Sequence, residues 1–309
     1  MCAGTKQHLL GPRTHELQAG GGSPRAFTLV ELLVVIGIVS VLMGILLPAL
    51  GAVRRQARAI VGMSNQRQIV GAVNCYAADN DDSYPVSVAT IAMWPQFSWQ
   101  EPMRLIGHQK RTPEVHRSMS AYLRSYISDA SVFSCPSAPD EHRYLQQAWD
   151  AGEDWCNPDM PLIKGPLTGT YCFYWNYTGY LVEEQVVFNG PSGPMGRRGQ
   201  SKLVVSCYFG YDHYRNRTVY GSCEKFGGAG VTEETWMDSA WWSGGSSDDG
   251  PDSIEIKPRA AYMDGHVESY SSSDVVPMDV IKDPLTNEPF ERGIGVGPGV
   301  FFLPHAALY

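Results

Sequence analysis

The most apolar part of the chain lies near its amino terminus and predicts a helix that spans a membrane. From Phe27 to Leu47 the sequence runs for 21 residues with one charged side chain, Glu31. The run is apolar all round, whereas a helix on the surface of a soluble core keeps a polar face. About 20 apolar residues cross the hydrocarbon core of a bilayer. A buried core helix and a signal peptide are the rival interpretations, but the apolar region of a signal peptide usually has about 7–15 residues.

The helical pattern continues beyond this apolar run. Further apolar residues recur at spacings of three and four, which is the period of one helix face. These residues are Val53, Ala57, Ile60, Val61, Ile69, Val70, Val73, Tyr76 and Ala77. We therefore expect one helix over residues 27–78, on the order of 78 Å long at roughly 1.5 Å per residue. Its first half, about 27–47, is suited to lipid, and its second half is suited to packing along one apolar stripe.

The remainder, residues 79–309, has the pattern of a β-containing head. The chain contains 32 Gly and 21 Pro, which favour turns. Short β-prone runs lie at 186–188, 202–209, 217–220, 260–263 and 266–270. Asp264-Gly265, between the last two runs, predicts a hairpin with a type I′ turn. Residues 226–253 are rich in Gly, Ser and Asp and predict a long loop insertion. The expected fold class is α+β, with the long amino-terminal helix packed on a turn-rich antiparallel β-sheet head.

Charge divides the chain into a basic beginning and an acidic remainder. Residues 1–26 carry Lys6, Arg13 and Arg25 against Glu16, which gives +2, and residues 27–78 carry +3. Because the whole chain has a net charge of −8, residues 79–309 carry −13. A general nucleic-acid binder presents a basic face, so we expect no nucleic-acid partner.

Two residues conflict with the chemistry of a membrane helix. Glu31 lies near the start of the apolar run, and an ionised side chain at the bilayer centre costs about 2.5–3.5 kcal/mol, less near the interface. Pro48 lies within the long helix and removes one backbone hydrogen bond. An acid in a membrane segment indicates a functional residue, and a merely interfacial position is the alternative.

Residues 25–36, with the sequence RAFTLVELLVVI, resemble the amino-terminal segment of type IV pilins and type II secretion pseudopilins. In that family a prepilin peptidase removes a basic leader, and the new terminal residue, usually Phe, is N-methylated. An acid at the fifth mature position and a proline at the twenty-second recur there, and counting from Phe27 these are Glu31 and Pro48. The resemblance implies cleavage between Ala26 and Phe27 and N-methylation of Phe27. The family commonly has Gly at the position of Ala26.

The resemblance also implies how such a chain works. Glu31 would pair with the methylated amine of Phe27 on a neighbouring subunit, so Glu31 and Pro48 are expected to serve assembly. The implied partners are prepilin peptidase, other pilin or pseudopilin subunits, an inner-membrane assembly platform and membrane lipid. The implied location is the inner membrane, crossed once, with the head in the periplasm or outside the cell. Arg54, Arg55 and Arg58 follow the membrane segment, against the tendency of basic residues to remain cytoplasmic.

Several islands further along are similar to a large bacterial pseudopilin-like family. They are residues 64–69, 76–80, 84–85, 132–137 and 262–268, and the last contains the Asp-Gly-His hairpin. His266 is expected at the start of a strand, and a metal or catalytic role is the less favoured alternative. Many relatives carry a cysteine near Met63, which this chain lacks, so their disulfide pattern is not transferred.

The cysteines predict an extracytoplasmic head. Cys2 lies in the leader and would leave with it. The other six, Cys75, Cys135, Cys156, Cys172, Cys207 and Cys223, permit three disulfides whose connectivity the sequence leaves open. Oxidised cysteines indicate the periplasm or the cell exterior, and buried free thiols are the alternative. No C-x-x-C occurs, so the spacing indicates neither a redox motif nor a zinc knuckle.

Calcium is the metal for which the sequence offers candidates, and they are weak. Asp248, Asp249 and Asp252 lie in the predicted insertion. Residues 79–82 are also oxygen-rich, but they lack the spacing and the glycine of an EF-hand loop. We expect them to end the long helix instead. No cofactor is otherwise expected.

Catalytic motifs are absent from the sequence. It contains no G-x-S-x-G, H-E-x-x-H, Walker loop or dinucleotide fingerprint. We therefore expect a non-enzymatic, prepilin-like structural subunit that prepilin peptidase processes and that assembles into a type II secretion pseudopilus or a type IV pilus-like filament. The alternative is a membrane-anchored extracytoplasmic binding module or hydrolase that uses the pilin segment as an anchor alone. Among filaments, DNA uptake is the least favoured because the head is acidic.

Overall fold

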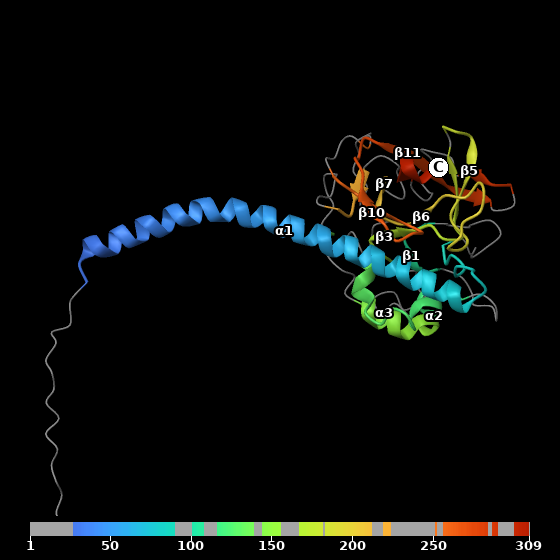
Figure 1. Ribbon diagram of the computed structural model, residues 1–309, viewed down its shortest axis with the longest axis horizontal. Helices are drawn as coiled ribbons and strands as arrows, with labels where there is room; N and C mark the ends of the chain where they lie inside the picture. The colour runs from blue at the N-terminus through green and yellow to red at the C-terminus, as the bar shows by residue number, and fades with distance from the viewer. Residues whose placement is uncertain are drawn as a thin grey trace, which may run out of the picture. The chain divides into compact units, whose positions relative to one another are not determined.

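The computed structural model describes most of the chain, in two units. The described residues are 27–89, 101–107, 116–138, 144–155, 167–181, 183–211, 219–223, 251, 256–283, 286–289 and 300–308. The two units are Met1–Gly51 and Ala52–Tyr309, and the boundary between them falls inside helix α1 (Figure 1). The predicted leader, 1–26, and nearly all of the predicted insertion, 226–253, lie outside the described residues.

Helix α1, Leu29–Asp79, confirms the single long helix that the sequence predicts. It ends at the acidic cluster, where Asp81 and Asp82 have φ angles of 51° and 54°. Such left-handed conformations end a helix, and Asp and Asn tolerate them better than other non-glycine residues. The Asp82 amide donates to the Ala77 carbonyl at 2.9 Å, and the Asn80 side-chain amide donates to the Tyr76 carbonyl at 2.8 Å. Residues 79–82 therefore serve as a helix terminus, as expected.

The second half of α1 contributes one face to the core of the second unit. Its buried residues are Gly62, Asn65, Gln66, Ile69, Val70, Ala72, Val73 and Ala77. The predicted stripe is correct from Ile69 onward and wrong before it, because Val53 and Ile60 are 61 % and 60 % exposed. The buried face begins at Gly62 and includes the polar pair Asn65 and Gln66, which hydrophobic periodicity does not detect.

Within the described residues of the second unit, thirteen strands form three antiparallel sheets. The smallest pairs β1 (Arg104–Ile106) with β2 (Leu167–Thr168). A four-stranded sheet has the order β10 (Val267–Ser269), β9 (Arg259–Tyr262), β6 (Leu203–Cys207) and β3 (Tyr171–Phe173). The largest has the order β5 (Val186–Asn189), β4 (Thr178–Leu181), β11 (Val275–Asp283), β13 (Val300–Pro304), β7 (Phe209–Tyr211) and β8 (Val219–Gly221), and β12 (Glu288–Pro289) pairs with β11. The described parts of the predicted runs at 186–188, 202–209, 217–220, 260–263 and 266–270 all overlap strands, and the run at 202–209 covers β6 and the start of β7.

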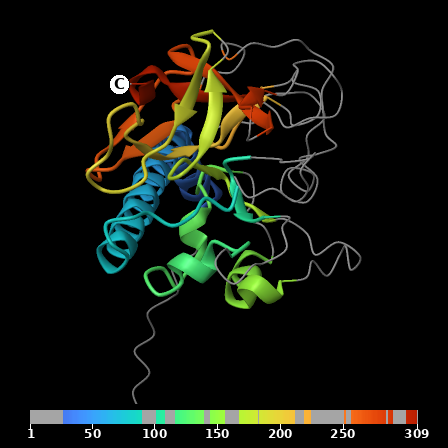
Figure 2. The ribbon, with the colours of Figure 1, turned by 90° about the vertical axis from the view of Figure 1, so that its right-hand side faces the viewer.

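Short helices cover the end of the second unit opposite the largest sheet. They are α2 (Ser120–Leu123), η1 (Ala130–Phe133), α3 (Leu145–Ala151) and η2 (Gly152–Asp154). Both ribbon views show α2 and α3 at one end and strands of the largest sheet, such as β11, at the other (Figures 1 and 2). A last short helix, η4 (His305–Leu308), follows β13. This arrangement is the α+β fold expected from the sequence.

The four-stranded sheet is buried on both faces. Tyr171 and Phe173 of β3 belong to the hydrophobic cluster that contains α1, whereas Cys172 between them belongs to the cluster that contains the largest sheet. In β9, Ala261 faces the first cluster and Ala260 the second. Successive side chains of a strand point to opposite faces, so this sheet forms the middle layer of the unit.

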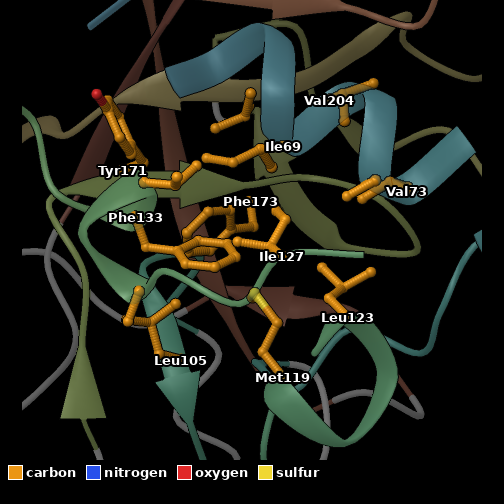
Figure 3. Packing of buried hydrophobic residues seen from close by; sticks show 14 of the residues in the cluster. Ile69, Val73, Leu105, Met119, Leu123, Ile127, Phe133, Tyr171, Phe173 and Val204 are labelled. Atoms are coloured by element: carbon orange, nitrogen blue, oxygen red, sulfur yellow. The ribbon is translucent and has the colours of Figure 1, made fainter. Parts of the chain in front are cut away.

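The first cluster packs α1 against the four-stranded sheet and the short helices. Ile69 and Val73 of α1 lie near Phe133, Ile127 and Phe173 in this core (Figure 3). The rings of Phe133 and Phe173 meet edge to face with centroids 5.9 Å apart. These aromatic and aliphatic side chains form one closely packed core. The carboxyl-terminal half of α1 is therefore an integral part of the second unit.

The hairpin predicted at Asp264-Gly265 is present, but its turn type differs from the prediction. Strands β9 and β10 pair antiparallel, and the Tyr262 amide donates to the His266 carbonyl at 3.1 Å. Gly265 has a φ of 84°, whereas Asp264 does not have a positive φ. A type I′ turn needs positive φ at both central residues. The loop is therefore a three-residue connection, Met263-Asp264-Gly265, with the left-handed position at the glycine.

Candidate functional site

The amino-terminal end of α1 is closed by a reciprocal pair of hydrogen bonds between Thr28 and Glu31. The Glu31 amide donates to the Thr28 hydroxyl oxygen at 3.2 Å. In return, the Glu31 carboxylate accepts from the Thr28 amide and from the Thr28 hydroxyl, each at 2.8 Å. This is the capping-box arrangement, in which two otherwise unpaired helix donors are satisfied at once. The acid that conflicts with the apolar run thus has a local structural role at the start of the helix.

The geometry also leaves Glu31 suited to a second contact. Both bonds from Thr28 end on the same carboxylate oxygen, Oε2. The other carboxylate oxygen, Oε1, accepts neither of these two bonds, and Glu31 is exposed. A carboxylate accepts at both oxygens, so a cationic amine from another molecule has an acceptor that the capping box does not use.

The rest of this segment is an unpartnered apolar helix. Every described residue from Phe27 to Leu50 is exposed, and the helix is long and apolar enough to cross a membrane. Exposed apolar surface on this scale marks a membrane or protein contact. Phe27 itself is 74 % exposed, and Pro48 lies inside the helix. Ala26, on the other side of the predicted cleavage point, lies outside the described residues.

The candidate residues outside this segment have varied positions. Asp248, Asp249 and Asp252 lie outside the described residues, so calcium binding there stays a prediction. His266 precedes β10, as expected, and its ring stacks on Tyr262 with centroids 4.4 Å apart. The His266 Nδ1 atom lies 2.5 Å from Asp264 Oδ1. Backbone and side-chain hydrogen bonds from His266 lower the pKa of the Asp264 carboxyl. These contacts stabilise the hairpin loop.

The six candidate cysteines separate into distinct environments. Cys75 is exposed on α1, Cys172 is buried in the cluster with the largest sheet, and Cys156 lies outside the described residues. Cys135, Cys207 and Cys223 are buried together, with all three Sγ atoms within 4.8 Å of one another. The five described cysteines are free thiols. Pairing of the six cysteines into disulfides stays a prediction, and the structure adds a thiol cluster that the sequence did not indicate.

The thiol cluster has an uneven electrostatic environment. Hydrogen bonds from Cys207 and Cys223 lower the pKa of the Cys135 thiol well below its usual value. Burial raises the pKa of Cys207 to about 12 and that of Cys223 well above its usual value. Burial acts to lower the pKa of Arg259, but the neighbouring thiols outweigh it and raise that pKa. Thiol hydrogen bonds therefore favour the ionised form of Cys135, whereas burial favours the protonated forms of Cys207 and Cys223.

Arg259 and Gln66 are site residues that sequence reasoning missed. Arg259 begins β9 and is 2 % exposed, and Gln66 on α1 is fully buried. A polar pair on a helix and a strand, far apart in the chain, gives no local spacing signal. Charged and polar side chains are seldom fully buried. Arg259 and Gln66 therefore stand out as site residues once the structure shows that they are buried.

Comparison with known protein families gives a match at the amino-terminal end of the chain. Residues 23–47 match the family described as the prokaryotic N-terminal methylation motif. No curated protein and no solved structure matches the chain. The matched residues include the capping box, Glu31 and most of the exposed apolar run. The amino-terminal segment of this chain therefore matches a prokaryotic N-terminal methylation motif, and this match supports the type IV pilin and pseudopilin family.

Proposed function

We propose that this chain is a structural prepilin that assembles into a type II secretion pseudopilus or a type IV pilus-like filament. The observation that carries the proposal is the exposed apolar half of α1, which begins with the methylation motif and has Glu31 as its one charged residue before Arg54. A surface of this kind is stable in lipid, or against the same surface of other subunits.

Processing is the first step of the proposal. Prepilin peptidase would cut between Ala26 and Phe27, which exposes the Phe27 amine for N-methylation. The test is co-expression of the full chain with a prepilin peptidase, followed by mass spectrometry of the product. We expect loss of residues 1–26 and one added methyl group at Phe27. An uncut chain under conditions that process a control prepilin would contradict the proposal. Ala26→Gly is the matched variant, with equal or faster cleavage expected.

Assembly is the second step, and Glu31 is its proposed determinant. A buried charge is tolerated when it is paired and costly when it is not. The Glu31 carboxylate, through the oxygen that Thr28 leaves unused, would accept the methylated Phe27 amine of a neighbouring subunit. The pair would then set the stagger between adjacent helices.

Two substitutions separate this pairing from helix capping. Glu31→Gln retains a side-chain oxygen for the Thr28 bonds but loses the charge, whereas Glu31→Leu loses both. We expect both variants to be inserted and cleaved but depleted from sheared surface filaments or from the secretion complex. Normal assembly of Glu31→Gln together with failure of Glu31→Leu would show that capping, rather than charge pairing, is the requirement.

The proposal also includes orientation, partners and the absence of catalysis. The second unit would lie in the periplasm or outside the cell, and the implied partners are other pilin subunits, the inner-membrane assembly platform and lipid. We propose no enzymatic role because the sequence contains no G-x-S-x-G, H-E-x-x-H, Walker loop or dinucleotide fingerprint. A reporter fused after Tyr309 tests the orientation, and a cytoplasmic signal would contradict the proposal.

A further inference from the structure

Three cysteines that are far apart in the sequence meet beneath α1. Cys135 follows η1, Cys207 ends β6, and Cys223 lies just after β8. All three are buried in the cluster that packs α1 against the four-stranded sheet. Because they come from three separate segments, any ligand that binds all three ties those segments together.

The separation of the sulfur atoms suits a single metal ion. The three Sγ atoms lie within 4.8 Å of one another, and those of Cys135 and Cys223 are 3.9 Å apart. With Zn–S bonds of about 2.3 Å, thiolates around one zinc ion lie about 3.8 Å apart in tetrahedral geometry and about 4.0 Å apart in a plane. Thiolates are the soft ligands that select zinc over calcium or magnesium.

Charge balance also favours a divalent ion. Arg259 is buried, and its Nη1 atom has no hydrogen-bond partner among the described residues. One side-chain amide, that of Gln66, donates to both Cys207 Sγ and the Arg259 carbonyl, and β9 pairs with β6, so Arg259 lies beside the cluster. One Zn²⁺ with three thiolates carries a net charge of −1, which the guanidinium neutralises. A buried cation without such a partner is strongly disfavoured.

Helix α1 supplies the outer wall of the cluster. The Gln66 side-chain amide donates to Cys207 Sγ at 3.5 Å and to the Arg259 carbonyl at 3.1 Å. Gly62 allows Arg259 to approach the helix, since a Cβ atom there would lie 2.8 Å from Arg259 Nη1. Hydrogen bonds to ligand sulfurs are typical of the groups that orient metal ligands.

We propose that Cys135, Cys207 and Cys223 bind one Zn²⁺ ion as thiolates, with Arg259 as the compensating charge and Gln66 as a positioning residue. On binding, each thiol that is still protonated releases its proton to solvent, and no electron is transferred. The ion fastens the segments after η1 and β8 to β6 beneath α1. The role is structural, and it does not depend on filament assembly.

The rival state is a disulfide between two of the three cysteines, which an oxidising compartment favours. A disulfide consumes two thiolates, leaves the third cysteine unpaired and removes most of the negative charge that compensates Arg259. The two states differ in zinc content and in free thiols, so they are distinguishable in the purified protein.

The test uses the full chain in detergent, purified without reductant or chelator. We expect about one zinc per chain by elemental analysis. We also expect Co²⁺, added to the zinc-depleted protein, to produce a thiolate-to-cobalt charge-transfer band. Zn²⁺ should protect the three cysteines from alkylation, which needs no variant and therefore holds even where a variant fails to fold. A disulfide within the cluster, or free thiols that bind neither Zn²⁺ nor Co²⁺, would overturn the proposal.

Variants separate the cluster from the other buried cysteine. Cys135→Ser, Cys207→Ser and Cys223→Ser should each abolish stoichiometric zinc and the cobalt band, whereas Cys172→Ser, the matched buried control, should retain both. Gln66→Leu should weaken Zn²⁺ affinity about 10–100-fold, as removal of a hydrogen bond to a ligand usually does, with the cobalt band retained at saturation. Equal zinc content in Cys207→Ser and Cys172→Ser would refute the assignment.

Discussion

The contact of α1 with the second unit can be tested at two isoleucines of the same helix. Ile69 is fully buried in the cluster with Phe133 and Phe173, whereas Ile60 is 60 % exposed. Substitution of a buried Ile by Ala removes its contacts and leaves a cavity, at a cost of about 2–5 kcal/mol. Substitution of an exposed residue usually changes stability by less than about 0.5 kcal/mol. Ile69→Ala should therefore destabilise the protein, and Ile60→Ala should not.

The magnitude gives a measurable shift. A loss of about 3 kcal/mol lowers the unfolding temperature of a unit of this size by roughly 6–12 °C. Ile69→Val, which removes one methylene group, should cost only about 0.5–1.5 kcal/mol. The ordering of the three variants follows from the exposed fraction of each side chain and from the volume removed.

Tryptophan fluorescence during thermal or urea unfolding of the full chain in detergent provides the assay. Trp149 and Trp175 belong to the same cluster and are 2 % and 1 % exposed, so unfolding exposes both to solvent. Equal shifts for Ile69→Ala and Ile60→Ala would mean that α1 does not dock through the face that contains Ile69. A larger effect for Ile60→Ala would place the buried face on the opposite side of the helix.

The remaining predictions concern three glycines and one tyrosine. Gly71 lies on the exposed side of α1 with open space around it, so Gly71→Ala should stabilise the protein by about 0.5–1 kcal/mol. A Cβ atom at Gly190 would overlap the Tyr174 carbonyl, so Gly190→Ala should destabilise it by at least about 1–3 kcal/mol. Urea unfolding compares the two variants, and a Gly190→Ala protein as stable as the parent would contradict the close approach. Gly265→Ala in the hairpin loop, at a φ of 84°, should cost about 1–2 kcal/mol and Gly265→Asn less, measured in the same way; equal costs would argue against a left-handed requirement. Burial raises the pKa of Tyr84 from 10.0 to about 12, so its contribution to stability is complete below the unfolded pKa and is lost as the pH rises through the folded one. Tyr84→Phe should therefore lose less stability than the parent between neutral pH and about pH 11, and parallel pH profiles of the two proteins would contradict this assignment.

Elements with strong local signals were predictable from the sequence. The long helix was predicted to within two residues of its described start and one of its end, because periodicity and the acidic cluster at 79–82 both act locally. The strands at 186–189 and 203–207 and the hairpin at 259–269 follow from short β-prone runs and turn residues. The hairpin's turn type was wrong because one glycine at the left-handed position was enough for a three-residue loop.

Other strands depend on partners that the sequence does not reveal. In β11, Pro277 lies opposite Phe302 of β13, although proline in a strand usually argues against a central position. Pairing on both sides of this strand, with β4 and with β13, outweighs that local preference. Strand formation here reflects tertiary pairing more than propensity.

The sequence by itself determined the membrane-competent half of α1, the methylation motif with Phe27 and Glu31, and the acidic character of the remainder. These features depend on composition and on spacings of a few residues, which are fixed by the covalent order of the chain. Only the tertiary structure decided that the docking face of α1 begins at Gly62, that Glu31 caps its own helix through Thr28, and that Cys135, Cys207 and Cys223 meet beside Arg259. The cap depends on local side-chain geometry. The docking face of α1 and the cysteine cluster arise from contacts between distant segments, because all layers of a packed core together determine which residues are buried and paired.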